Sequence, residues 1–170
     1  ILVKGVSGIH IQTHDVIIRY LRVRLDGTGG LAQGQAYISM VNGAYNVILD
    51  HCSGSWSLDE GIQIWMSESP PSPDITSVTI QYCISSEGLW RHSMGMIIGG
   101  QAGQDDGNSN VPSDIYLKVH EVSVHHNLFA HNQDRNPNVA SAGTQVINNV
   151  VYNWMGRVGV SSKKNTVDFI

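Results

Sequence analysis

The chain has 170 residues and a formal net charge of −4, with 41% hydrophobic and 14% charged residues. This length fits a single domain over residues 1–170, and the apolar content is too high for a disordered segment. The net negative charge gives no basic footprint, so we expect no nucleic-acid partner. No apolar run reaches the length of a membrane span, so we expect no membrane partner either.

Short apolar runs that alternate with polar residues recur along the whole chain. They are bounded by Gly, Asn, Asp, Ser and Pro, and glycine alone occurs 18 times. Alternation with a period of two, punctuated by turn residues, is typical of β-strands, whereas helical periodicity is nearly absent. The sequence therefore predicts an all-β protein.

One pattern repeats: apolar, any, apolar, two further residues and then a small or polar turn residue. Successive copies start 22 to 44 residues apart, and their first residues are Val16, Val47, Val78, Val122, Thr144 and, for a truncated copy, Val167. If each copy is one coil of a parallel solenoid, equivalent residues stack about 4.8 Å apart. The repeat predicts a solenoid of about six coils, with loops where the spacing is longer.

Stacking places the last residues of these copies in one column at a turn, namely Leu21, Cys52, Cys83, Asn127 and Asn149. Asparagine at a turn bonds to nearby backbone, so both asparagines are interpreted as structural. Cys52 and Cys83 become neighbours in this column. Buried free thiols and a disulfide both remain open, and two cysteines do not decide the compartment.

A second set of short strands lies between the repeats, over residues 38–40, 61–64, 94–98 and 139–141. In a solenoid the residues that precede these strands share one face. The groove predicted there collects residues from distant parts of the sequence, namely Gln35, Ala36, Asp59, Glu60, Gln63, Arg91, His92, Met94, Asp134 and Arg135.

Four strings then follow in order: DHCS from Asp50, SWSLDE from Ser55, HHNLFAHNQDRNP from His125 and NNVVYNW from Asn148. Together they resemble the pectate lyase family, polysaccharide lyase family 1. The resemblance implies a right-handed parallel β-helix, a single-stranded solenoid of three short sheets, of which this chain would be a part. It also implies a secreted or periplasmic, monomeric enzyme whose partner is an acidic polysaccharide.

Such enzymes cleave pectate by β-elimination, which gives 4,5-unsaturated oligouronides. The reaction needs a base for the C5 proton and cations that stabilise the charge developing at the uronate carboxylate. By resemblance, Ca²⁺ held by Asp59 and Glu60 supplies the cation, and Arg135 is the base. We assign substrate binding to Arg91, Trp65, Gln63 and Asn138, with Trp65 as the sugar-stacking residue.

The chain departs from the family pattern at several supporting charges. Gln63 stands where a second acid is common, Met94 where a lysine is common, and Asn138 where a basic residue often follows. A guanidinium is a poor base unless neighbouring cations lower its pKa. Two mechanisms therefore stay open: either Arg135 is the base, or Arg135 clamps the carboxylate and His92 takes the proton.

Two other functions remain alternatives. One is a metal-independent lyase on methyl-esterified pectin or another uronate polymer, and the other is a non-catalytic β-helix that binds polysaccharide. A hydrolase is less favoured, because adjacent Asp59 and Glu60 would point opposite ways on a strand. By the same alternation, His51 and His126 are expected to point into the core.

Overall fold

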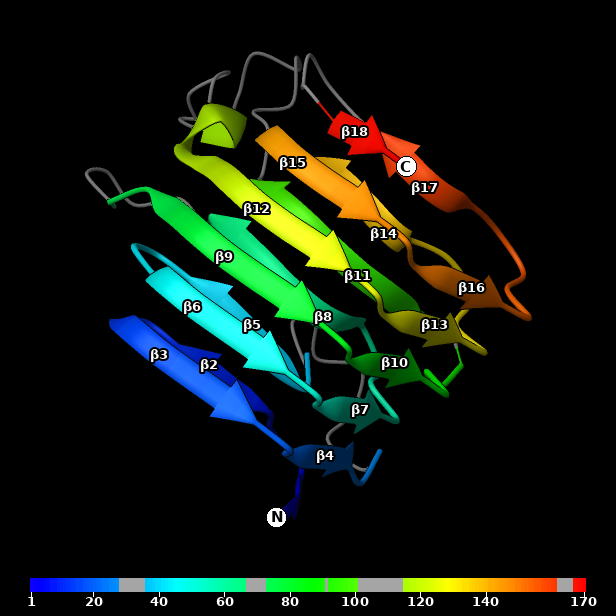
Figure 1. The fold of residues 1–170 in the computed structure, drawn as a ribbon. Helices are drawn as coiled ribbons and strands as arrows, with labels where there is room; N and C mark the ends of the chain where they lie inside the picture. Colours follow the sequence, from blue (N-terminus) through cyan, green and yellow to red (C-terminus); the bar gives the residue numbers. More distant parts are fainter. Residues whose placement is uncertain (28–35, 67–72, 91, 101–114, 162–166) are drawn as a thin grey trace, which may run out of the picture.

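The structure is a computed structural model that describes residues 1–27, 36–66, 73–90, 92–100, 115–161 and 167–170. Arg91, one of the predicted substrate-binding residues, lies outside these ranges. The described residues form three parallel sheets of six strands each (Figure 1). The chain is thus a parallel β-helix, and its six strands per sheet confirm the predicted number of coils.

We name the three sheets A, B and C. In chain order, sheet A contains β1 (Leu2–Gly5), β4 (Arg22–Leu25), β7 (Ser53–Ser55), β10 (Ile84–Ser86), β13 (Leu128–Ala130) and β16 (Val150–Tyr152). Sheet B contains β2 (Ile9–Ile11), β5 (Ile38–Val41), β8 (Glu60–Met66), β11 (Met94–Gly100), β14 (Asn136–Ala140) and β17 (Val158–Ser161). Sheet C contains β3 (His14–Arg19), β6 (Tyr45–Asp50), β9 (Ile75–Gln81), β12 (Val119–His125), β15 (Ala142–Ile147) and β18 (Val167–Phe169).

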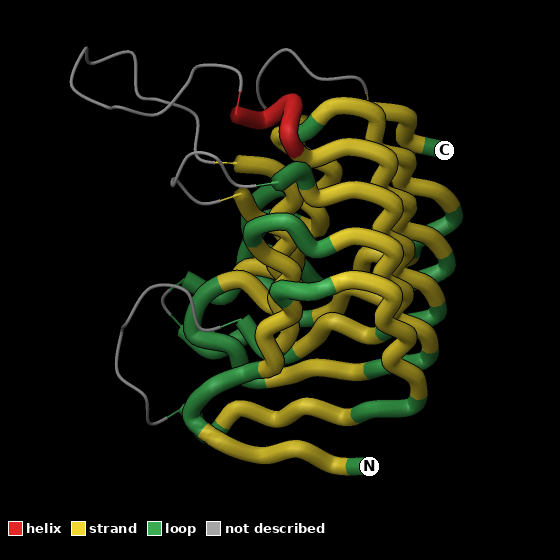
Figure 2. Tube along the Cα trace, turned by 90° about the vertical axis from the view of Figure 1, so that its left-hand side faces the viewer, coloured by secondary structure: helices red, strands yellow, loops and turns green. Residues whose placement is uncertain are grey.

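Each coil runs from sheet B through sheet C to sheet A, and the coils stack along one axis with the two termini at opposite ends (Figure 2). A short 3-10 helix, η1 (Ile115–Lys118), precedes β12. The register of sheet C confirms the sequence repeat, because the predicted first residues of the copies pair directly with one another. They form the series Val16, Val47, Val78, Val122, Thr144 and Val167.

One strand boundary was predicted wrongly. The sequence pattern placed a groove strand at residues 139–141, whereas β14 spans Asn136–Ala140. The Asn136-Pro137-Asn138 segment has no apolar alternation, so the sequence pattern did not indicate a strand there. In the structure Asn138 pairs with Ile97 in β11. The strand therefore begins directly after Arg135.

The core is the interior of the solenoid, filled by the inward side chains of all three sheets. Val47, Val78 and Val124 are completely buried. Tyr37 is the largest fully buried side chain among the described residues, and a Cβ at Gly54 would lie 2.0 Å from its ring. Glycine at position 54 therefore makes the room that the buried tyrosine needs.

The turn between sheets C and A, which we call the ladder turn, holds the predicted column. The Asn149 carboxamide oxygen accepts the Asn127 backbone N–H at 2.9 Å, and that of Asn127 accepts the Cys83 backbone N–H at 2.8 Å. The Cys83 sulfur continues the series by accepting the Cys52 backbone N–H at 3.4 Å. Both cysteines are buried free thiols in the structure.

His51 and His126 do not point into the core, which corrects the sequence interpretation. Both have positive φ, 53° and 57°, and both are exposed. The left-handed backbone at this turn breaks the alternation on which the interpretation rested. Their rings instead form an exposed stack with Tyr82 between them.

Candidate functional site

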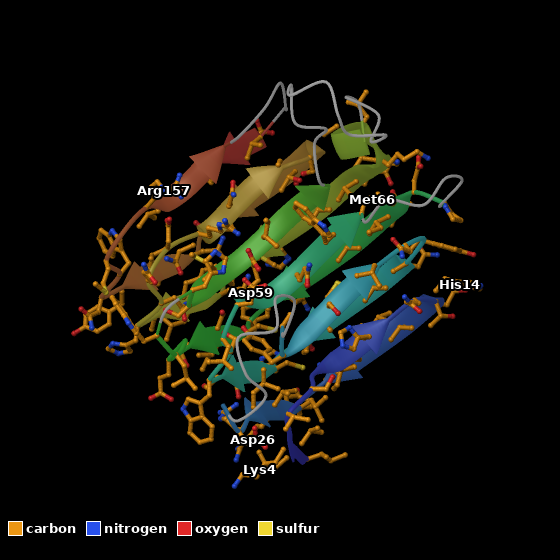
Figure 3. The ribbon with its side chains drawn as sticks, turned by 180° about the vertical axis from the view of Figure 1, so that it is seen from behind. Lys4, His14, Asp26, Asp59, Met66 and Arg157 are labelled. Atoms are coloured by element: carbon orange, nitrogen blue, oxygen red, sulfur yellow. The ribbon has the colours of Figure 1, made fainter. Side chains whose placement is uncertain are left out.

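The candidate site lies on the turn that leads from sheet A into sheet B, which we call the site turn. Glu60 is the first residue of β8 with Asp59 directly before it, His92 precedes β11, and Arg135 precedes β14. Sheet B has the strand order β14-β11-β8, so these residues come from three consecutive coils on one face. Asp59 lies near the middle of this face (Figure 3).

Asp59 and His92 form a hydrogen-bonded pair. The Nδ1 atom of His92 contacts Oδ1 of Asp59, which is buried, while the His92 ring is half-exposed. When Nδ1 donates to the carboxylate, the lone pair of the ring lies on Nε2. The pair therefore presents an oriented imidazole at the surface of the groove.

Glu60 and Arg135 form an ion pair that crosses one whole coil. The Nη1 atom of Arg135 contacts Oε1 of Glu60, although β11 lies between their strands. Met94, which is buried, pairs with Glu60 on one side and with Asp134 on the other. An apolar side chain thus occupies the position between the two acids, where the family resemblance led us to look for a lysine.

The Glu60 carboxyl has a strongly perturbed environment. It is 5% exposed, and its pKa is raised to about 7 by burial and by its hydrogen bond with Asp59, against the opposing effect of Arg135. Adjacent Asp59 and Glu60 therefore do not point opposite ways as the sequence suggested. One ligand atom from each of Asp59, Glu60 and His92 lies within 4.8 Å of the others.

Asp134 holds the backbone that carries Arg135. Its Oδ1 accepts the N–H of Arg135 at 2.7 Å and the N–H of Arg157 at 2.9 Å. The Arg157 guanidinium adds contacts to Oδ2 at 2.6 and 3.0 Å, and these bonds lower the pKa of Asp134 although burial opposes them. Arg135 itself has a φ of 53°, a left-handed conformation that needs such support.

Several polar atoms at the site turn have no hydrogen-bond partner among the described residues. They are Nε of Arg135, Nδ2 of Asn136 and Oε1 of Gln133, and all three are buried. An unsatisfied buried polar group costs free energy, typically about 1–3 kcal/mol. Such groups are rare in folded proteins, and three of them lie together beside Arg135 at this turn.

The structure brings only some of the remaining predicted residues together. Gln63 and Asn138 both pair with Ile97, so they lie on one outward column of sheet B, half-buried. Trp65 is also half-buried, two residues farther along β8. The other tryptophans are more exposed, and Trp90 and Trp154 on the site turn are 68% and 48% exposed.

The Asp134–Arg157 pair was missed in the sequence, although a signal for it exists. The two residues are 23 residues apart, which is the length of a bare coil, so the repeat places them in adjacent coils. The turn residues carry the same periodicity.

Comparison with known proteins connects this geometry to a family. A protein named Probable pectate lyase C from Aspergillus flavus is 36% identical over 159 residues, and its namesake from Emericella nidulans is 37% identical over the same number. These matches cover 94% of this chain. The chain is related to the pectate lyases.

The chain spans about a third of the length of these curated relatives, since the matched segment is 31% of each. No family model matches the chain. Across the described residues, no helix combines the length and hydrophobicity that a membrane crossing requires.

The acids partly fit a calcium ion. Carboxylate oxygens are the ligands that Ca²⁺ prefers, and Asp59 and Glu60 supply them close together. Calcium takes six to eight oxygen ligands, so water and substrate carboxylates would have to supply the rest. His92 offers nitrogen, which Ca²⁺ does not favour, and both acids already contact a basic side chain.

Proposed function

We propose that the protein is a polysaccharide lyase that cleaves pectate, or polygalacturonate, by β-elimination and releases 4,5-unsaturated oligouronides. The observation that carries this proposal is the cluster at the site turn, where Arg135, Glu60, Asp59 and His92 meet from three coils. The relationship to proteins named as pectate lyases supports the same reaction and an acidic polysaccharide substrate. A long acidic polysaccharide is degraded outside the cell, so we also propose that the protein is secreted.

Arg135 serves the uronate carboxylate. A planar guanidinium binds a carboxylate through two parallel hydrogen bonds, and the Arg135 side chain stays partly exposed beside its ion pair with Glu60. As the C5 proton leaves, negative charge grows on the carboxylate, and a fixed cation at that position stabilises it.

The proton acceptor is the point on which the two mechanisms differ. Asp59 orients His92 through Nδ1, so Nε2 is a suitable base at neutral pH. Arg135 already pairs with Glu60, so its guanidinium is engaged as a hydrogen-bond donor to a carboxylate. This pairing favours His92 as the base and Arg135 as the carboxylate clamp.

A calcium ion, when bound by Asp59 and Glu60, would add positive charge beside the substrate carboxylate. Deprotonated Glu60 is needed for this, and its pKa of about 7 makes the neutral form common below that pH. Asp59 would contribute to the ion and to the orientation of His92 at once. We therefore propose calcium as an accessory whose binding strengthens as the pH rises.

A second candidate is a metal-independent lyase that acts on methyl-esterified pectin or another uronate polymer. The specific observation in its favour is that both acids are already engaged within the protein, Asp59 in a hydrogen bond with His92 and Glu60 in an ion pair with Arg135. An esterified uronate carries no charge, and its elimination needs hydrogen bonds to the ester carbonyl rather than a divalent cation. Gln63 and Asn138 on the adjacent column are donors of this kind.

One assay separates these functions. The protein is incubated with polygalacturonate and with esterified pectin, each with added Ca²⁺ and with EDTA, and ultraviolet absorbance follows the new C4–C5 double bond. Activity on polygalacturonate that EDTA removes and Ca²⁺ restores supports the first candidate. Activity on esterified pectin that persists in EDTA supports the second. Retention on either polymer without new absorbance would mean a non-catalytic binding protein.

The pH profile of the same assay tests the base. If His92 is the base, kcat falls as the pH drops through roughly 6 to 7, and His92→Asn removes that limb of the profile. Activity that rises only above about pH 9 in both proteins would instead assign the base to Arg135.

A further inference from the structure

The positively charged side chains fall into two groups that differ in their partners. Seven lysine and arginine side chains lie in the described part of the chain. Four of them pair with carboxylates, namely Arg19, Lys118, Arg135 and Arg157. The other three, Lys4, Arg22 and Arg24, have no ion pair with a described residue, and all three lie on β1 and β4 of sheet A.

These three cations share the outer face of sheet A. In β4 the side chains of Val23 and Leu25 are buried, so Arg22 and Arg24, which alternate with them along the strand, point outward. Lys4 is exposed and pairs directly with Arg24 across the two strands. Figure 3 shows Lys4 at the end of the ribbon, near Asp26, the first acid that follows β4.

This arrangement has a cost for folding. Strands pair about 4.8 Å apart, and residues two apart on one strand are about 7 Å apart, so three like charges share a small area. Like charges directly opposite each other destabilise a sheet. Arg24 is also fixed outward by bonds from Nη1 to the Ser53 carbonyl oxygen at 3.1 Å and from Nη2 to the Ser53 hydroxyl at 3.0 Å. Local choices that oppose stability are expected where a sequence serves binding.

From this geometry we infer that the outer face of β1 and β4 is a second binding surface for acidic polysaccharide, separate from the site turn. We call it the basic face, defined by Lys4, Arg22 and Arg24. The identity of the polymer rests on the proposed function. A flexible chain that carries a carboxylate on every sugar complements three cations on a flat sheet, whereas tight binding of nucleic acid needs more phosphate contacts than three cations supply.

The two surfaces are close enough in the fold to act on one polymer. Arg24 pairs with Ser55 in β7, and the chain continues from Ser55 through the site turn to Asp59. The basic face therefore lies around the corner of the solenoid, toward the N-terminal coils. Tethering a long polymer there would raise its concentration at the groove without touching the reacting sugar.

Binding is measured in the Arg135→Lys background with EDTA present, by native electrophoresis through gels that contain polygalacturonate. Removing two cations with Lys4→Gln and Arg22→Gln should weaken retention roughly fivefold, and the loss should shrink at high salt. The matched control, Arg19→Gln with Lys118→Gln, removes the same net charge from ion-paired positions and should change retention little. Equal losses in both double variants would overturn the proposal, since net charge alone would then explain binding.

Two further measurements sharpen the test. Lys4→Gln should raise the thermal midpoint at low ionic strength and not at about 1 M salt, because it relieves repulsion from Arg24. A lower midpoint at low salt would contradict the inferred repulsion. Gels that contain duplex DNA should retain the protein less than polygalacturonate does, and equal retention would overturn the assignment to polysaccharide.

Turnover separates this inference from the proposed function. On a short oligouronide the double variant with Lys4→Gln and Arg22→Gln should keep the parent rate, while its KM for the long polymer rises. Polymer retention that depends on the basic face in a protein without lyase activity would sink the proposed function alone. Full lyase activity with retention independent of these cations would sink the basic face alone.

Discussion

The ladder turn and the site turn both place residues from successive coils in a column. They differ in the side chains that make up that column. At the ladder turn each side chain accepts the backbone N–H of the residue stacked beside it: Asn149 accepts from Asn127, and Asn127 accepts from Cys83. At the site turn successive coils contribute Glu60, Met94 and Asp134, followed by Arg135. The ladder satisfies the backbone N–H groups of Asn127 and Cys83, whereas at the site turn the Arg135 side chain reaches across a coil to Glu60.

Two ion pairs show the difference most directly. Asp50 at the ladder turn and Glu60 at the site turn are buried alike, at 4% and 5% exposure, and each contacts an arginine. Burial raises the pKa of both carboxyls, but bonds from His51, Gln81 and Arg19 lower that of Asp50. Glu60 has Asp59 beside it instead, and its pKa rises to about 7. Only the second carboxyl is set to change its charge near neutral pH.

The largest expected effect separates the two arginines. Arg135→Lys should lower kcat on polygalacturonate about 10³-fold, because a lysine cannot reproduce the planar fork that holds a carboxylate in the transition state. Arg19→Lys makes the same chemical change at the ladder turn and should leave kcat near the parent value. Ultraviolet absorbance measures both, and a circular dichroism spectrum shows whether each variant folds. Comparable kcat in the two variants would contradict the assignment of the groove.

The ladder turn should respond in stability instead. Asn127→Ala removes the acceptor of the Cys83 N–H and the donor to the Ile80 carbonyl, bonds of 2.8 and 3.0 Å. Leaving these buried groups unsatisfied should cost about 3 kcal/mol of unfolding free energy. Urea denaturation measures this loss. Asn153→Ala is a milder comparison, since its amide bonds to the exposed side chain of His131. A change below about 0.5 kcal/mol would show that the ladder does not stabilise the coils.

The sequence predicts the ladder turn better than the site turn, for the same physical reason. A repeated residue type fixes its own register, so Cys52, Cys83, Asn127 and Asn149 could be aligned without coordinates. The site turn has no repeated chemistry. The meeting of Asp59, His92 and Arg135 on one face followed from stacking, but the partner of each could not be predicted, because it depends on side-chain reach. Arg135 extends past Met94 to Glu60, a contact between residues 75 apart that no local pattern encodes.

A smaller effect on kcat is expected from substitutions at residues that position Arg135 than from substitution of Arg135 itself. Asp134→Asn keeps the shape of the side chain, but its amide replaces one oxygen that accepts hydrogen bonds from Arg157 and from the Arg135 backbone. Arg135 would then move by a fraction of an ångström, and kcat should fall about tenfold with little change in KM. Arg157→Gln should reproduce part of this loss. A drop in thermal midpoint without a drop in kcat would mean that the pair serves folding only.

The smallest expected effect is on the pH dependence of the unfolding free energy. The contributions of Glu60 and Asp50 to this dependence have opposite signs. Glu60 binds its proton more tightly in the folded protein, with a pKa of about 7 against an ordinary value of 4.5. Unfolding between these values releases a proton, so the Glu60 contribution to stability decreases as the pH rises from about 4.5 to 7. The pKa of Asp50 is lowered, so its contribution is present above 3.8 and is lost as the pH falls below that value. Urea denaturation between pH 3 and pH 8 should show that Glu60→Gln removes a decline toward neutral pH, whereas Asp50→Asn removes a decline toward acid. If Glu60→Gln changed stability only at acidic pH, Glu60 would be ionised near neutral pH in the folded protein. The two turns would then differ in their hydrogen-bond partners and not in the pKa of their carboxyls.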